Sequence, residues 1–289
     1  MSSPAQPSDK KNSDLVPRII VALIGVPVLL GAAFLGPNWL LSTFVTIAGT
    51  IGAWEYMRMT LNNDFRVDGW IGVAAVAALL SVAYWAPTPL FVGATAFAVT
   101  MAVFVCVLFS LKTVQESAHR IGAIFSGIVY MGVLFGAYAL LVREGTPSQT
   151  GPTQAGWFLF PMFIVWAGDT GAYFVGRAIG KHKLSPMVSP GKSWEGAIGG
   201  LFFSVLGAFV ASWILPLPAM PAWLIVTMAI PGAILGQIGD LCESMIKRAT
   251  GYKDSSRILY GHGGMLDRVD ALIFAVPWVL LARELWLPA

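Results

Sequence analysis

The chain has very few charged residues for its length. Asp, Glu, Lys and Arg make up 11% of its 289 residues, whereas soluble domains contain about one quarter. This scarcity excludes an ordinary soluble globular protein, because long apolar runs with few charges are typical of membrane spans. The sequence therefore predicts an all-α polytopic integral membrane protein.

Cysteine is also scarce, since only Cys106 and Cys242 are present and both lie in or at the end of apolar runs. This excludes a disulfide framework and a cysteine-based metal site. The sequence also lacks a Walker-type phosphate loop and a basic cluster interleaved with aromatic residues. We therefore expect no nucleic-acid partner and no inserted nucleotide-binding domain, so any nucleotide would bind at the cytoplasmic ends of the helices.

Nine apolar stretches are each long enough, or nearly so, for a tilted transmembrane helix. Aromatic residues lie at many of their ends, as they do at membrane–water interfaces. The stretches cover residues 19–35, 39–54, 70–86, 90–111, 121–142, 157–175, 197–215, 222–241 and 271–286. Residues 1–14 have almost nothing to bury and are expected to form a disordered polar tail.

The Lys and Arg residues lie mainly in alternate connections of this nine-helix arrangement. Of the 18, only Arg143 and Arg283 fall on the opposite side. The positive-inside rule then places the N-terminus and the polar segment 244–270 in the cytoplasm, and the C-terminus outside. We expect a multi-pass protein of the cell inner (plasma) membrane.

The segment 244–270 is the most charged part of the chain and mixes carboxylates, cations and glycines. Carboxylates bind hard cations such as Mg²⁺, Lys and Arg neutralise phosphate charge, and glycines let the backbone approach a ligand closely. The alternative is a positive loop beside the membrane whose acids only pair with its cations. On a helix, Asp240, Glu243 and Lys247 share one face, as do Asp267 and Asp270.

Two further stretches carry polar residues suited to chemistry. Asp169 lies within an apolar run, where an acid is expensive and marks a functional site by default; the alternative is a structural pair with Arg177. In residues 189–196, serine, glycine and lysine together suit phosphate, and Glu195 either caps the next helix or joins a metal site. Glu55 and Arg58 are expected to be a solvated helix end.

The order of these residues closely resembles the signature of the phosphatidate cytidylyltransferase (CDP-diacylglycerol synthase) family. The family has Ser-x-apolar-Lys-Arg, then Lys-Asp, then His-Gly-Gly-x-x-Asp-Arg-x-Asp. Here these are Ser244, Ile246, Lys247, Arg248, Lys253, Asp254, His262, Gly263, Gly264, Asp267, Arg268 and Asp270. The stretches around Asp169 and Lys192 also resemble family elements, although Ser193 replaces a usual Thr, and Tyr260 stands where Pro, Gly or Ser is usual.

The resemblance implies that CTP and phosphatidate give CDP-diacylglycerol and pyrophosphate. Hydropathy predicts that residues 15–156 form about five N-terminal transmembrane helices, and the resemblance implies that residues 157–289 form a catalytic region of about four helices with cytoplasmic loops. Mg²⁺ is the expected cofactor, a second, monovalent cation is left open, and the family's dimeric habit implies a homodimer.

The expected roles of the site residues follow this chemistry. Asp240 and Asp267 are the expected metal ligands. Glu243, Asp270 and Asp169 are supporting or substitute ligands; Lys192, Lys247, Arg248, Lys253 and Arg268 hold phosphates; and Ser189, Ser193 and Ser244 donate hydrogen bonds. Gly263 and Gly264 contact substrate, and His262 either contacts phosphate or braces the glycine turn.

Three other functions compete with this interpretation. A transporter or channel also has intramembrane acids and interrupted helices, but its charges would gather at the bilayer midplane. A CTP-dependent kinase of a long-chain alcohol would share the nucleotide chemistry. A CDP-alcohol phosphotransferase would need an Asp-Gly…Ala-Arg…Asp…Asp run, which this sequence lacks.

Overall fold

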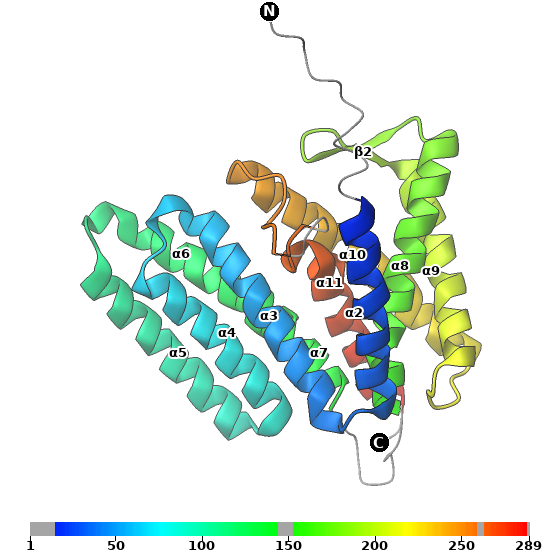
Figure 1. Ribbon diagram of the computed structural model, residues 1–289, viewed down its shortest axis with the longest axis horizontal. Coiled ribbons are helices and arrows are strands. Elements are labelled where there is room, and N and C mark those ends of the chain that lie inside the picture. Colours follow the sequence, from blue (N-terminus) through cyan, green and yellow to red (C-terminus); the bar gives the residue numbers. More distant parts are fainter. Residues whose placement is uncertain (1–14, 144–152, 259–262, 288–289) are drawn as a thin grey trace, which may run out of the picture.

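The computed structural model describes residues 15–143, 153–258 and 263–287, which are helical almost throughout (Figure 1). The long helices are α2 (Leu15–Leu35), α3 (Asn38–Leu61), α4 (Val67–Trp85), α5 (Pro89–Ser110), α8 (Thr153–Ile179), α9 (Trp194–Ile214), α10 (Ala222–Ala249) and α11 (Leu266–Trp286). Between α5 and α8 run η2 (Val114–Glu116), α6 (Ser117–Gly127), the π-helical turn η3 (Ile128–Leu134) and α7 (Gly136–Leu141). A short 3-10 turn, η1 (Asn62–Asp64), follows α3.

Six helical segments within the described ranges are long and apolar enough to cross a membrane. They are α4, α5, the run Val114–Leu141, α8, α9 and α10. This supports the prediction of an all-helical polytopic membrane protein. The count of nine spans and the orientation of the termini stay predictions.

Several helices extend beyond the stretches that hydropathy delimits. Helix α3 continues past residue 54 to Leu61, and α10 continues past residue 241 to Ala249. Hydropathy falls where charged residues begin, whereas the helical hydrogen bonds continue into the polar rim. As a result, Asp240, Glu243 and Lys247 all lie on the last turns of α10.

The structure adds one small sheet that the all-α expectation did not include. Strands β1 (Lys183–Ser185) and β2 (Ser189–Ser193) form an antiparallel hairpin that connects α8 to α9. Two prolines and a glycine interrupt this segment, and both residue types disfavour a continuous helix. The hairpin places Lys192 beside the ends of the neighbouring helices.

Close packing at glycines fixes α8 against α9. A Cβ atom on Gly168 would lie 2.2 Å from the Ser204 hydroxyl, and one on Gly171 would lie 2.4 Å from the Phe203 ring. Small residues let membrane helices approach at backbone distance. This packing sets the position of Asp169, which lies between these two glycines on α8.

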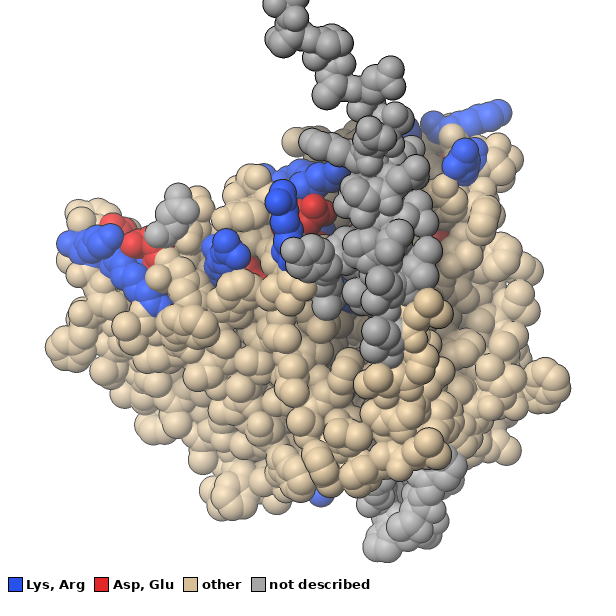
Figure 2. All heavy atoms as spheres, viewed as in Figure 1, with Lys and Arg blue, Asp and Glu red and all other residues tan. Residues whose placement is uncertain are grey.

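Charged side chains gather along one rim of the molecule. Figure 2 shows Lys, Arg, Asp and Glu concentrated at the top of this face, above a body with few visible charges. In the N-terminal half, the buried guanidinium of Arg120 donates to both Asp68 carboxylate oxygens at 2.6 Å and to Asp64 Oδ2 at 2.8 Å. Lys112 also donates to Asp64 at 3.0 Å, and this bond lowers the pKa of the Asp64 carboxyl group.

The buried pair of Arg120 and Asp68 predicts a large stability effect. Arg120→Ala leaves the fully buried Asp68 carboxylate without its cation, which costs about 3–5 kcal/mol. The free energy of unfolding in detergent, measured by denaturant titration, is expected to fall by that amount. Lys112→Ala is the control, because this exposed lysine contributes at most about 1 kcal/mol. Equal effects of the two substitutions would contradict the prediction.

Candidate functional site

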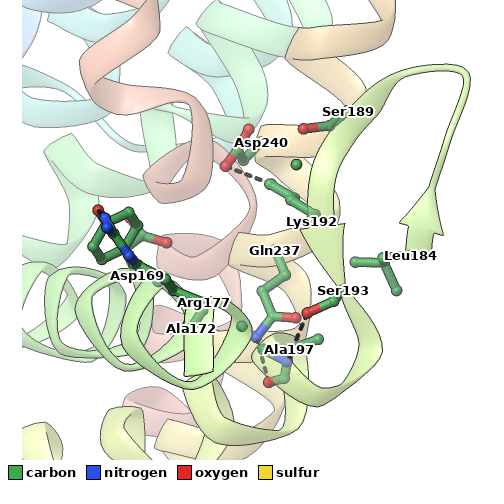
Figure 3. Close-up of a pocket in the computed structure, with 14 residues that line it drawn as sticks. Asp169, Ala172, Arg177, Leu184, Ser189, Lys192, Ser193, Ala197, Gln237 and Asp240 are labelled. Atoms are coloured by element: carbon green, nitrogen blue, oxygen red, sulfur yellow. Dashed lines mark hydrogen bonds and ion pairs between the residues drawn. The ribbon is translucent and has the colours of Figure 1, made fainter. Parts of the chain in front are cut away.

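An open cavity of about 620 Å³ lies between α8, the hairpin and α10 (Figure 3). Residues from three separate parts of the sequence line it, and they provide both charged groups and a small apolar wall. The polar lining residues are Asp169, Tyr173, Arg177, Ser189, Lys192, Ser193, Gln237 and Asp240. The structure therefore brings together the two polar stretches that the sequence singled out and the first acid of α10.

Lys192 and Asp240 make the central contact in this cavity. The Lys192 ammonium lies 2.6 Å from Asp240 Oδ2, and both side chains are partly exposed to the cavity (Figure 3). Ser244 donates to Asp240 Oδ1 at 3.4 Å from the next turn of α10. The Asp240 carboxylate therefore receives contacts from the hairpin and from its own helix.

Two further acids lie near Asp240. Its carboxylate is close enough to repel those of Asp169 on α8 and Asp270 on α11 electrostatically. Lys192 balances part of this charge at Asp169, and Lys247 balances part at Asp270. Asp169 and Asp240 thus reach the cavity from two helices, and Asp270 lies on a third helix nearby.

Ser193 and Glu195 have clear structural partners. The buried Ser193 hydroxyl accepts from the Gly196 N–H at 3.2 Å and so caps α9. Glu195 accepts from the Lys181 N–H at 3.1 Å and from the His182 N–H at 3.2 Å, and its Oε1 lies 2.6 Å from His182 Nδ1. Glu195 therefore fixes the segment that enters the hairpin. Of its two expected roles, the structural one agrees better with these contacts.

A second cluster of charges surrounds Lys247. Its ammonium pairs with Glu243 one turn earlier on α10 and lies 2.7 Å from Asp267 Oδ1 on α11. Glu243 is fully buried, and Lys247 and Asp267 are nearly so. This lysine is therefore the only group in the described residues that forms ion pairs with both acids.

The other oxygen of Asp267 is bonded to the loop before α11. Asp267 Oδ2 accepts from the Ser255 N–H at 3.0 Å, the Ser255 hydroxyl at 2.9 Å and the Gly264 N–H at 2.8 Å. Asp267 thus links Ser255 to Gly264 through Oδ2, and its other oxygen, Oδ1, contacts Lys247.

Glu55 holds the same loop from α3, and its expected position at a solvated helix end is wrong. Its carboxylate is 0% exposed. It accepts hydrogen bonds from the Met265 N–H at 3.0 Å, the Leu266 N–H at 2.7 Å and the Ser256 hydroxyl, and the Ser255 hydroxyl lies 3.0 Å from its Oε2. Glu55 therefore caps the N-terminus of α11 from about 200 residues away in sequence. Glu55 directly follows an apolar run, but nothing in the local sequence indicates that it contacts the loop before α11.

The two glycines of this loop allow side chains to approach the backbone closely. Gly263 has a φ of +79°, and a Cβ atom on Gly264 would lie 2.0 Å from the Ser255 hydroxyl and 2.5 Å from Glu55 Oε1. Both glycines thus allow contacts within the protein, and their predicted contact with substrate stays a prediction. His262 and Tyr260 lie outside the described residues.

The remaining predicted residues lie near the end of α10. Arg248 donates to the Tyr252 carbonyl at 3.3 Å, and Arg268 is exposed on the first turn of α11. Lys253 lines a second pocket of about 450 Å³ together with Arg58 of α3 and Arg257. The expected metal ligands Asp240 and Asp267 each pair with a lysine, and among the described residues no group of three or more His, Cys, Asp and Glu has the arrangement of a metal site.

Comparison with known proteins identifies the family. Residues 16–286 match the sequence profile of the cytidylyltransferase family. A phosphatidate cytidylyltransferase of Pseudomonas aeruginosa is 36% identical over 277 residues, covering 93% of this chain and 96% of the relative. One from Staphylococcus epidermidis is 32% identical over 263 residues, covering 90% and 94% of the two chains. The chain is therefore a member of the cytidylyltransferase family, as its resemblance to the phosphatidate cytidylyltransferases predicted.

Proposed function

We propose that the protein is a phosphatidate cytidylyltransferase that acts at a membrane surface. A phosphate oxygen of phosphatidate attacks the α-phosphorus of CTP, the bond to the β-phosphate breaks, and pyrophosphate leaves as CDP-diacylglycerol forms. The observation that carries the proposal is the convergence of Asp169, Lys192 and Asp240 from three distant segments on one cavity. Such a transfer needs mainly positioning and neutralisation of charge.

The cavity suits the lipid substrate. Ala172, Leu184 and Ala197 give it an apolar wall, whereas Arg177 and Lys192 supply positive charge. A phosphate group on an acyl-bearing molecule requires both kinds of surface at once. We therefore infer that the phosphate of phosphatidate lies near Lys192, where the side chain of Ser189 can donate to it.

The acids around Asp240 supply oxygen donors of the kind that a divalent cation would need. Asp169, Asp240 and Asp270 repel one another, and such a set of hard oxygen donors is the kind that Mg²⁺ binds together with substrate phosphates. Asp240 and Asp267 are the proposed ligands, supported by Asp169, Glu243 and Asp270. When bound, Mg²⁺ would neutralise phosphate charge and polarise the reacting phosphoryl group.

Asp267→Asn tests the metal assignment. Turnover at limiting Mg²⁺ is expected to fall more than about 100-fold and to recover partly at high Mg²⁺. The expected loss is this large because mutating even the residues that only position metal ligands reduces metal affinity or activity by about 10- to 100-fold. The measurement is incorporation of radiolabelled CTP into chloroform-extractable lipid, together with the Mg²⁺-induced rise in unfolding temperature. The control is Glu116→Gln, which makes the corresponding acid-to-amide change far from Asp267 in sequence, in the N-terminal half of the chain. A native rate at limiting Mg²⁺ would remove Asp267 from the metal site.

A second label position separates the competing kinase of a long-chain alcohol, because cytidylyl transfer keeps the α-phosphate of CTP in the lipid whereas a kinase transfers the γ-phosphate. With CTP labelled at the γ-phosphate and a prenol in place of phosphatidate, no labelled lipid product is expected, whereas the kinase would form labelled prenyl phosphate. Membrane orientation is a further part of the proposal: we infer that the charged rim faces the cytoplasm at the inner membrane, from the distribution of Lys and Arg. A homodimer rests on the family's habit alone, and cross-linking in native membranes tests it.

A further inference from the structure

The pocket beside Arg58 is the strongest site that the proposed mechanism does not use. We call it the basic pocket. It has a volume of about 450 Å³, and its lining residues come from α3 and from the loop that follows α10. They are Arg58, Gly251, Tyr252, Lys253, Asp254, Ser255, Ser256 and Arg257.

The basic pocket carries excess positive charge. Three cations line it against one carboxylate, that of Asp254. Among the described residues, none of the three cations lies within ion-pair distance of an acid; the Arg58 guanidinium instead lies 5.3 Å from the centre of the Trp54 ring. Cations gathered without carboxylate partners attract a polyanion, and arginine can bind phosphate through two parallel hydrogen bonds.

The lining also indicates which substrate fits. The basic pocket has no aliphatic side chain among its lining residues, unlike the cavity, where Ala172, Leu184 and Ala197 form an apolar wall. An acyl-bearing molecule would find less apolar surface there than in the cavity. The basic pocket therefore suits a water-soluble phosphate compound.

The basic pocket and the cavity lie toward the same end of α10. Asp240 near this end lines the cavity, and the loop that follows Ala249, the last residue of α10, lines the pocket. Lys247 and Asp267 lie between them. The pocket loop is also held at Ser255, whose N–H donates to Asp267 at 3.0 Å and whose hydroxyl lies 3.0 Å from Glu55 Oε2.

We propose that the basic pocket binds the phosphate tail of the nucleotide, with Arg58, Lys253 and Arg257 as its cationic contacts. This inference rests on the proposed function and deepens it. It assigns the lipid phosphate to the cavity and the leaving pyrophosphate to the pocket. It also makes α3, in the N-terminal half, a direct part of substrate binding.

The test compares Arg257→Gln and Arg58→Gln with Lys183→Gln, an exposed lysine that lines neither site. In mixed micelles, one series varies CTP at saturating phosphatidate and another varies phosphatidate at saturating CTP. A third measures inhibition by inorganic pyrophosphate. Both arginine variants are expected to raise the KM for CTP and the inhibition constant of pyrophosphate about tenfold, which is the loss of one charged hydrogen bond. The KM for phosphatidate is expected to stay within about twofold.

The outcomes distinguish this inference from the proposed function. If the KM for phosphatidate rises instead, the pocket binds the lipid phosphate and the assignment is overturned. The assignment is also overturned if neither the KM for CTP nor the inhibition constant of pyrophosphate changes. If the wild-type protein forms no CDP-diacylglycerol, the proposed function fails, and pyrophosphate binding by titration calorimetry still tests the pocket.

Arg58→Lys, which keeps the charge, is expected to recover most of the affinity for CTP and pyrophosphate. No recovery, together with a lowered unfolding temperature, would assign Arg58 to folding and overturn its role in binding.

Discussion

Glu55→Gln is expected to reduce turnover by about 100-fold or more, although Glu55 lies outside the sequence signature of the family. The Glu55 carboxylate accepts the N–H groups of Met265 and Leu266 on different oxygens. A glutamine amide turns one acceptor into a donor that faces an N–H group, and each unsatisfied buried donor costs about 1–3 kcal/mol. The loop that carries Asp267 would shift, and a displacement of about 1 Å at a reacting centre can cost 100-fold.

The measurement is the rate of CDP-diacylglycerol formation together with the unfolding temperature in detergent. Glu284→Gln is the matched control, because the same chemical change occurs at an exposed residue near the other end of α11. Glu284→Gln is expected to leave both quantities unchanged. Native turnover in Glu55→Gln would show that the loop does not depend on this cap.

Lys247→Met is expected to reduce both turnover and stability. The substitution leaves the buried Glu243 and Asp267 carboxylates beside each other without a cation, and breaking such a buried pair costs about 3–5 kcal/mol. The proposed role of Lys247 in holding phosphate predicts an additional loss of about 100- to 1,000-fold in turnover.

A double variant separates these two effects. Adding Glu243→Gln to Lys247→Met removes one of the two unpaired charges, so stability is expected to recover in large part while turnover does not. Lys183→Met is the control for loss of an exposed lysine. Recovery of turnover in the double variant would assign Lys247 a purely structural role.

The helical architecture and much of the cavity could be predicted from the sequence because they depend on local patterns. Hydropathy located the long helices, and helical spacing placed Asp240, Glu243 and Lys247 on one face of α10. The polar stretches around Asp169 and Lys192 were recognised individually, and the structure shows them lining one cavity. Whether Asp240 and Asp267 share an ion stays a prediction.

What could not be predicted depends on contacts between distant residues. Glu55 and Ser255 are separated by 200 positions, so no local pattern links them, and the charged residues near Glu55 looked like an ordinary helix end. The hairpin was missed because it is short and lies in a connection that was expected to be a cytoplasmic loop. In both cases tertiary contacts, rather than propensity, decide the local structure.

The cap on α11 has a consequence for how the protein matures. Every residue that lines the substrate cavity precedes residue 241, whereas the loop closes only when Glu55 meets Met265 and Leu266 at the start of α11. During synthesis the cavity residues therefore leave the ribosome before the loop can be locked. The loop that carries Asp267 can therefore adopt its closed form only after the start of α11 has been synthesised, so the order of synthesis separates formation of the cavity from closure of the loop.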